Sequence, residues 1–251
     1  MRLGFEEELA SAYTSPVQSI RVLSEHWLKR EGYCPNCGQP EFGQYRNNRP
    51  VADFFCPKCN EDFELKSQKG AIGAKLVDGA YRTMIERLAG TRNPNLFILN
   101  YDFTTLAVSN LFVVPKHFLN STIIEKRKPL GASARRAGWV GCNILLRQIP
   151  DSGRIFLIRN SAVEPKKKVL SQWQQTLFLR EQKKPSARGW LMNVMRCVEK
   201  LDRPIFTLGE IYACEEELKE IYPGNRHIKE KIRQQLQVLR DRSEEHTSEL
   251  Q

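Results

Sequence analysis

The chain has 251 residues, a length that suits one large domain or two, and its 41% hydrophobic and 27% charged residues are typical of a soluble globular protein. It contains no run of 18 apolar residues, and its acidic start lacks the apolar segment of a secretory signal. We therefore expect no membrane span, no secretion and a cytoplasmic location in the bacterial cytosol, where thiols stay reduced. The net charge of +10 favours a polyanionic partner, because each cation placed on a phosphate releases counterions.

The first two thirds of the chain predict an α/β domain with a mixed sheet. A helix is expected over residues 16–30, with Ser15 as N-cap, Pro16 at the first helical position and Gly32 after the end, and we interpret it as scaffold. A second helix is expected over residues 75–89, because Leu76, Ala80, Met84 and Leu88 recur at helical spacing. The strands are predicted from apolar or alternating runs at residues 63–67, 95–101, 110–118 and 154–160.

The character of the sequence changes near residue 182, so we predict one domain over residues 1–182 and a second over residues 183–251. Lys183, Lys184, Pro185 and Ser186 indicate a polar linker. Three helices should follow: one that carries Trp190 to Leu201, one that opens with a Thr207–Glu210 capping box, and one over residues 226–240. Three short amphipathic helices favour a small DNA-binding domain of helix-turn-helix type.

Four cysteines have the spacing of a zinc ribbon. Cys34 and Cys37 form one C-x2-C pair, and Cys56 and Cys59 form a second pair after 18 intervening residues. Each pair can direct two thiolates at one point, and two pairs complete the tetrahedron that Zn²⁺ prefers. Four thiolates leave no position for water, so the zinc should be structural rather than catalytic. The other three cysteines, Cys142, Cys197 and Cys214, are interpreted as unpaired core residues.

Two carboxylates and a lysine form a candidate catalytic cluster. Glu64 and Lys66 share one face of a strand because side chains alternate along it, and Asp53 precedes Glu64 by eleven residues. If the Asp53 segment pairs with that strand, both carboxylates can bind Mg²⁺ while leaving positions for water and phosphate. Lys66 would then hold or deprotonate the attacking water. The alternative interpretation is an ordinary surface Glu–Lys pair without a catalytic role. The Pro50-Val51-Ala52-Asp53 context, the hairpin and the helix soon after it favour the catalytic interpretation.

The chain also resembles the DpnI-like family of restriction endonucleases. The resemblance is carried by residues 33–69, by Lys128-Pro129-Leu130 with residues 134–139, and by residues 227–236, and it extends to about residue 241. It implies a PD-(D/E)XK nuclease core followed by a winged helix, and a Mg²⁺-dependent type II enzyme that cuts double-stranded DNA at GATC only when the adenine is N6-methylated. It implies catalytic roles for Asp53, Glu64 and Lys66, with Leu65 as a backbone ligand of the Mg²⁺, and Zn²⁺ on the four cysteines. We expect the protein to act as a monomer.

Two groups of residues are candidates for DNA contact. The resemblance implies that Trp139, beside Arg135 and Arg136, helps to form a methyladenine pocket, whereas the residues alone favour a core tryptophan. On the last helix, Arg226, Arg233, Gln234 and Gln237 fall away from the apolar stripe, and Arg and Gln suit base recognition in the major groove. A solvated basic face is the alternative for the second group, and Glu230 on that face favours this alternative.

The residues from about 242 onward do not have the pattern of a wing. They are acidic and lack the alternation of a β-hairpin, so we expect the wing to be missing. Either the tail resembles a translated sequencing adapter and is foreign to the gene, or the chain is a relative that has lost its wing. The competing function is a non-catalytic zinc-ribbon and winged-helix regulator of transcription. A zinc hydrolase is excluded because thiolates fill the zinc shell and the four histidines are scattered, so none is assigned a role.

Overall fold

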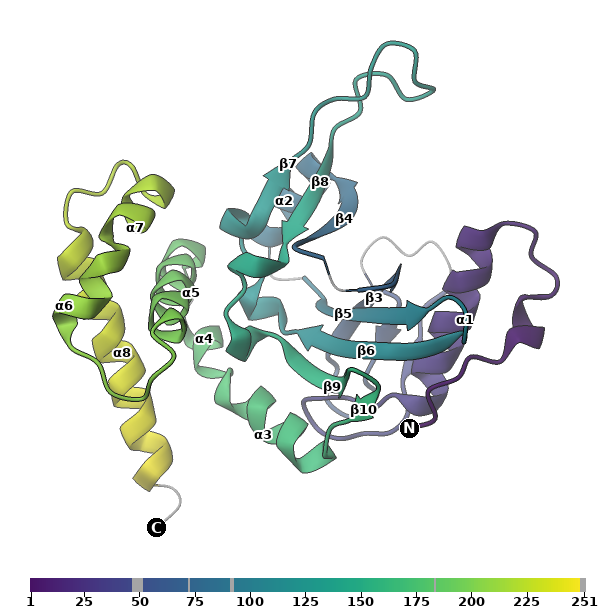
Figure 1. The fold of residues 1–251 in the computed structure, drawn as a ribbon, viewed down its shortest axis with the longest axis horizontal. Coiled ribbons are helices and arrows are strands. Elements are labelled where there is room, and N and C mark those ends of the chain that lie inside the picture. Colours follow the sequence, from purple (N-terminus) through teal and green to yellow (C-terminus); the bar gives the residue numbers. More distant parts are fainter. Residues whose placement is uncertain (47–51, 72, 91–92, 183, 249–251) are drawn as a thin grey trace. The chain divides into compact units, whose positions relative to one another are not determined.

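The computed structural model describes residues 1–46, 52–71, 73–90, 93–182 and 184–248 (Figure 1). The chain divides into two compact units, each built from several segments. The first unit comprises Met1–Ala74, Arg82–Leu119 and Ser152–Leu177, and the second comprises Lys75–Tyr81, Asn120–Asp151 and Phe178–Gln251. Across the described residues, no helix combines the length and the hydrophobicity that crossing a bilayer requires.

A seven-stranded mixed sheet forms the centre of the first unit. Its order is β1 (Gly43–Gln44), β2 (Phe54–Phe55), β3 (Asp62–Lys69), β5 (Asn95–Asp102), β6 (Ala107–Val114), β9 (Ile155–Arg159) and β10 (Ala162–Val163). Among the described strands of this sheet, only β3 and β5 pair in parallel. Such a pair needs a crossover connection, which here runs through β4 (Lys75–Ala80) and α2 (Tyr81–Ala89). The predicted strands at residues 95–101 and 154–160 are confirmed. The predicted strand at residues 110–118 ends at Val114, because Pro115 and a 3₁₀ turn follow it.

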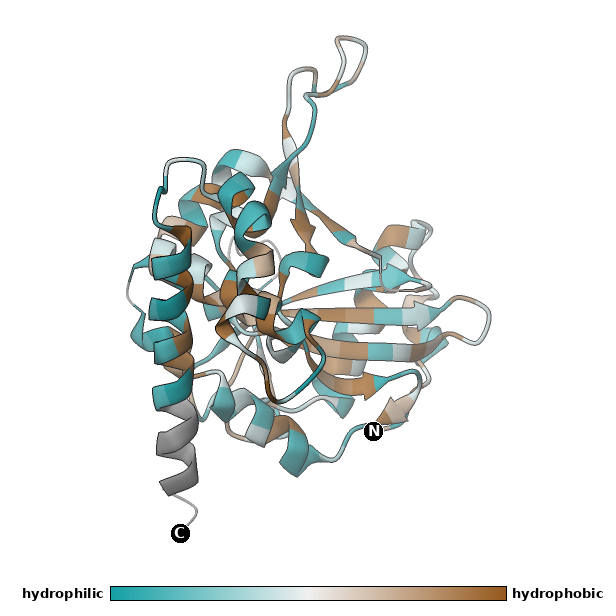
Figure 2. Cartoon of the chain, turned by 60° about the vertical axis from the view of Figure 1, so that its left-hand side comes forward, coloured by the Kyte–Doolittle hydropathy of each residue, from teal (hydrophilic) through white to brown (hydrophobic). Residues whose placement is uncertain are grey.

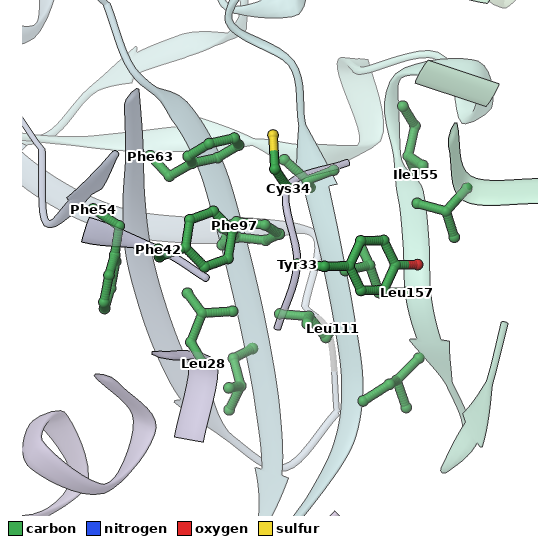
Figure 3. Close-up of a cluster of buried hydrophobic side chains, with 14 of the residues drawn as sticks. Leu28, Tyr33, Cys34, Phe42, Phe54, Phe63, Phe97, Leu111, Ile155 and Leu157 are labelled. Carbon is green, nitrogen blue, oxygen red and sulfur yellow. The ribbon is translucent and has the colours of Figure 1, made fainter. Parts of the chain in front are cut away.

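The core of this unit lies between the sheet and two helices, α1 (Pro16–Glu31) and α3 (Lys166–Gln175). Leu28 of α1 lies in one buried cluster with Phe97 of β5 and Leu111 of β6 (Figure 3). Trp27 of α1 and Trp173 of α3 belong to the same cluster. The central strand β5 is buried over seven of its eight residues, as its continuous apolar run predicts. The helix predicted at residues 16–30 is confirmed, with Pro16 in its first turn and Gly32 after its end. Ser15 is at the N-cap position, but its side chain makes no capping hydrogen bond.

The helix predicted over residues 75–89 is wrong in its first half. Residues 75–80 form β4, which pairs antiparallel with β8 (Gly141–Leu145), and β8 pairs in turn with β7 (Ile124–Lys126) in a three-stranded sheet of the second unit. Leu76 and Ala80 are four residues apart, and a spacing of four satisfies a strand as well as a helix, since it is also a multiple of two. Gly79 lowers helix propensity in this stretch, and the partner strand β8 decides the outcome.

The described part of the second unit also contains a series of α-helices that follow one another toward the C-terminus. They are α4 (Phe178–Glu181), α5 (Pro185–Lys200), α6 (Leu208–Ile211), α7 (Glu215–Ile221) and α8 (Ile228–Ser248). Short 3₁₀ turns complete the chain: η1 (Glu7–Ala10), η2 (Lys116–Phe118), η3 (Ser121–Ile123), η4 (Leu146–Gln148), η5 (Asp151–Gly153) and η6 (Tyr212–Cys214). A small core of Trp190, Val194, Ile211, Ile228 and Ile232 joins α5, α6 and α8. Figure 2 shows the alternation of apolar and polar residues along α8.

The helical region differs from the prediction in its linker and in the start of its last helix, and it agrees with the prediction in its capping box. The linker is shorter than predicted, because Pro185 and Ser186 belong to the first turn of α5, where proline suits the first position, while Lys183 lies outside the described residues. The capping box is confirmed, with the Glu210 carboxylate accepting from the backbone N–H of Thr207 at 2.7 Å. The predicted last helix begins two residues later, at Ile228, and the atypical tail continues it to Ser248 without a strand in the described part.

Candidate active site and metal centre

The four cysteines predicted to bind zinc meet in the first unit. Their sulfur atoms all lie within 4.8 Å of one another, with Sγ–Sγ distances of 3.6 Å for Cys34 and Cys59 and 3.5 Å for Cys37 and Cys56. Zinc–sulfur bonds of about 2.3 Å in a tetrahedron separate neighbouring sulfurs by about 3.8 Å. The cluster therefore fits a Zn²⁺ ion, and its four thiolates would complete the coordination shell.

The two C-x2-C turns have the same backbone design. In the first, the carbonyl of Cys34 accepts from the N–H of Gly38 at 2.8 Å, and in the second the carbonyl of Cys56 accepts from Asn60 at 2.9 Å. Gly38 and Asn60 both have positive φ, at 75° and 57°, a conformation that glycine and asparagine tolerate best. Each turn thus directs its thiols to one side. Burial raises the pKa of the Cys34 thiol, so binding of Zn²⁺ there would release its proton.

Helix α3 holds the first cysteine turn in place. The Lys166 ammonium donates to the carbonyl of Gly38 at 2.6 Å, and the Gln174 amide donates to the carbonyl of Asn36 at 3.0 Å. These contacts join residues more than 120 positions apart in the sequence. No local pattern in the sequence predicts them.

Asp53 lies where the hairpin between β2 and β3 brings it beside Glu64. The strands pair antiparallel, with Phe54 opposite Phe63, so the predicted pairing of the two segments is confirmed. The Asp53 carboxylate accepts from the backbone N–H of Leu65 at 2.8 Å. Because N–H and C=O of one strand residue point the same way, the Leu65 carbonyl faces the strand edge that Asp53 occupies. Pro50 and Val51, which belong to the predicted motif, lie outside the described residues.

Glu64 and Lys66 lie on the face of β3 that points away from the core. Phe63 and Leu65 pack into the core of the first unit, so the residues between and after them project from the other face. The Lys66 ammonium lies 2.7 Å from Oε1 of Glu64. The structure thus brings Asp53, Glu64 and Lys66 to one place on the sheet, with all three side chains half-buried.

The electrostatics of this cluster raise the pKa of Asp53. Burial is the largest cause, and the neighbouring carboxylates of Glu64 and Glu25 act in the same direction. The Leu65 N–H and the Arg21 guanidinium oppose the shift without cancelling it. Neighbouring carboxylates that raise one another's pKa in this way favour the binding of a cation.

Three charged residues at this site were not predicted from the sequence. Arg87 of α2 pairs with Glu64, its Nη2 lying 3.0 Å from Oε2. On α1, Arg21 pairs with Glu25 at 2.6 Å, and both influence the charge of Asp53. A helix interpreted as scaffold therefore contributes charges to the candidate active site. The i,i+4 spacing of Arg21 and Glu25 was the only signal, and such pairs are common on solvated helix faces.

Trp139 lies in the long loop between β7 and β8, which extends away from its sheet (Figure 1). It is half-buried, so the structure places it in neither core, and the Arg136 guanidinium lies 4.7 Å from its ring centre. A Cβ at Gly141 would lie 2.8 Å from the indole ring, so only glycine permits this packing. Arg135 and Arg136 are exposed. The loop, residues 127–140, carries four cations and no carboxylate.

The candidate residues of the last helix are all exposed. Arg226, Gln234 and Gln237 lie on or beside the outer face of α8, as the apolar stripe predicts. Arg233 donates to the hydroxyl of Tyr212, and its guanidinium lies 5.6 Å from that ring centre. This face also carries Lys229 and Glu230, so its charge is mixed but predominantly basic.

Comparison with known protein families agrees with both parts of the chain. Residues 1–182 match the DpnI family, described as the Dam-replacing family, and residues 186–244 match its C-terminal domain, described as the Dam-replacing HTH domain. The first match covers more than half of the chain and contains the cysteine cluster and the carboxylate site. The second match identifies the helical region as a DNA-binding module. The chain therefore belongs to the DpnI family of Dam-replacing proteins, a family of methyl-directed restriction endonucleases.

Proposed function

We propose that the chain is a Mg²⁺-dependent type II endonuclease that hydrolyses phosphodiester bonds of double-stranded DNA at GATC sites with N6-methylated adenine. The observation that carries the proposal is the meeting of Asp53, Glu64 and Lys66 on one hairpin, within a chain of the DpnI family. A transcription regulator, the competing function, has no use for such a cluster.

The hard oxygen donors of this cluster fit a magnesium ion. Asp53 and Glu64 would supply one carboxylate each, and the Leu65 carbonyl faces the same edge. When bound, Mg²⁺ supplies an activated water and neutralises the charge that develops on the phosphorus. Lys66, whose ammonium lies 2.7 Å from Glu64, would hold the attacking water, or would accept its proton when the amine is in its neutral form.

The residues proposed to read DNA lie on the two elements described above. Arg135 and Arg136 would contact phosphates, and the half-buried ring of Trp139 offers an apolar surface for a methyl group. The exposed Arg226, Arg233, Gln234 and Gln237 of the HTH domain offer the donors and acceptors that base edges require. We propose that the enzyme acts as a monomer in the bacterial cytoplasm.

Digestion of matched plasmids tests the proposal. The same plasmid is prepared from an adenine-methylating host and from a host that lacks this methylation, and each is incubated with the protein in Mg²⁺ or in EDTA. We expect fragments that map to GATC sites, from the methylated plasmid in Mg²⁺ only. Cleavage of both plasmids would refute the methyl-directed specificity, and cleavage in EDTA would refute the metal dependence.

A further inference from the structure

Arg87 is placed on the inner side of α2, next to the carboxylate site. It follows Met84 by three residues and precedes Leu88, and both of these neighbours are buried. Its side chain is 20% exposed, whereas Arg82 on the outer side of the same helix is 92% exposed and pairs with Glu86. A cation in the last turn of a helix also interacts favourably with the helix dipole, which is the ordinary role of such a residue. Arg87 differs because its partner is Glu64.

The two oxygens of Glu64 have different cationic partners. Oε1 lies 2.7 Å from the Lys66 ammonium, and Oε2 lies 3.0 Å from the Arg87 guanidinium. Each carboxylate oxygen has two lone pairs, so a metal can approach either one, and it approaches more readily the oxygen whose present partner can move aside. Lysine presents rotatable donors on a flexible stem, whereas the planar guanidinium of arginine holds its partner in a fixed geometry. Oε1 is therefore the oxygen that becomes available, and Oε2 stays with Arg87.

We propose that Arg87 is a positioning residue that holds Oε2 of Glu64 and so presents Oε1 to the metal. This inference rests on the proposed function, since it takes Glu64 as a ligand of Mg²⁺. The direction of the expected change in metal affinity distinguishes this inference from a simple charge effect. A positive charge near the site repels a cation, so its removal by charge alone would tighten metal binding. Loss of an orienting partner weakens binding instead, typically by about 10- to 100-fold.

Binding of Mn²⁺, followed by its EPR signal, tests this inference without requiring cleavage. Manganese takes the same oxygen ligands as magnesium. The zinc-loaded wild-type protein is compared with R87A, R87K, E64A and the matched control R82A, and Mg²⁺-dependent plasmid cleavage is recorded alongside. We expect R82A to behave as wild type, E64A to lose the site, and R87A to bind Mn²⁺ at least about tenfold more weakly. R87K should fall between, because lysine keeps the charge but not the planar fork.

The outcomes distinguish this inference from the proposed function. If E64A loses Mn²⁺ binding while R87A binds it as well as wild type or more tightly, Arg87 is not a positioning residue and the proposed metal site stands. If E64A binds Mn²⁺ normally, Glu64 is not a ligand and both proposals fail. If R87A does not fold, R87K carries the test, and wild-type Mn²⁺ affinity in R87K overturns the inference.

Discussion

Asp53 and Glu64 are held together by the backbone rather than by a chance approach of side chains. The Asp53 carboxylate accepts from the N–H of Leu65, the residue next to Glu64, so the strand pairing fixes one carboxylate relative to the other. Burial and like charge keep the pKa of Asp53 raised. The same features that make the two carboxylates unfavourable neighbours make them a good site for a divalent cation.

Removing either carboxylate should abolish cleavage while preserving DNA binding. Asp53→Ala or Glu64→Ala removes a hard ligand of the metal, whose stabilisation of the transition state amounts to several kcal/mol, so the rate should fall by roughly 1,000-fold or more. Affinity for DNA should change little, because it depends mainly on contacts to phosphates and bases. Plasmid cleavage and a binding assay in Ca²⁺ measure the two effects. Undiminished cutting by both variants would contradict the catalytic assignment.

Asp53→Asn should stabilise the protein in the absence of added Mg²⁺, although it should also be inactive. The pKa of Asp53 is higher in the folded than in the unfolded chain, so the folded state binds the proton more tightly and the ionised carboxylate destabilises it at neutral pH. That cost disappears as the pH falls through the raised pKa. Thermal melts should therefore show a higher Tm for the variant at pH 7, and a difference that shrinks on acidification. A lower Tm at pH 7 would contradict this.

The sequence could predict Asp53, Glu64 and Lys66 because their relation is local. One hairpin and the period of two along a strand are enough to bring them together. Arg87 could not be predicted in the same way, since its contact with Glu64 depends on how α2 returns across the sheet. Glu25 likewise reaches the site through the packing of α1 on the sheet, which composition and spacing do not encode locally.

Among the secondary-structure elements, the segment at residues 75–89 shows where periodicity fails. Its apolar positions at intervals of four fit both a helix and a strand, and the choice is made by β8, which lies more than 60 residues away in the sequence. The helix at residues 16–30 had no such competitor, because its N-terminal proline and following glycine mark both ends. Residue patterns in the sequence predict an element correctly when its ends are marked by nearby residues. They fail when a distant partner strand determines whether the segment is a strand or a helix.

The cysteine turns are an element whose stability should depend on zinc. Cys34→Ser or Cys56→Ser removes one of four thiolates, and structural zinc contributes its binding energy to folding, so we expect a loss of several kcal/mol in the free energy of unfolding. Elemental analysis should find one zinc per wild-type chain and less in these variants, and urea unfolding measures the stability. Cys214→Ser is a suitable control, because Cys214 is half-buried and lies outside the cluster. A folded wild-type protein without zinc would contradict the assignment.

At the level of the whole molecule, the net charge of +10 should make DNA binding strongly dependent on salt. The exposed cations lie on elements of different kinds, including the β7–β8 loop and α8. Contacts to phosphates contribute to the salt dependence but carry no sequence information. Contacts to bases and methyl groups carry the sequence information and contribute little to the salt dependence. Salt dependence and methyl preference are therefore separable properties of the same protein.

This separation gives a prediction for neighbouring residues of one loop. Arg135→Ala or Arg136→Ala should make the fall of log affinity with log salt less steep, by about 1 in the magnitude of the slope for each lost phosphate contact. The preference for methylated GATC should not change. Trp139→Ala should leave the slope unchanged and reduce the preference. A methyl group buried by transfer alone contributes about 0.8 kcal/mol, or about fourfold, so any larger wild-type preference requires the shape of the pocket as well. Competition between methylated and unmethylated duplexes at several salt concentrations measures both quantities. If Trp139→Ala keeps the full preference, the ring only packs against Gly141, and the methyl group is read elsewhere.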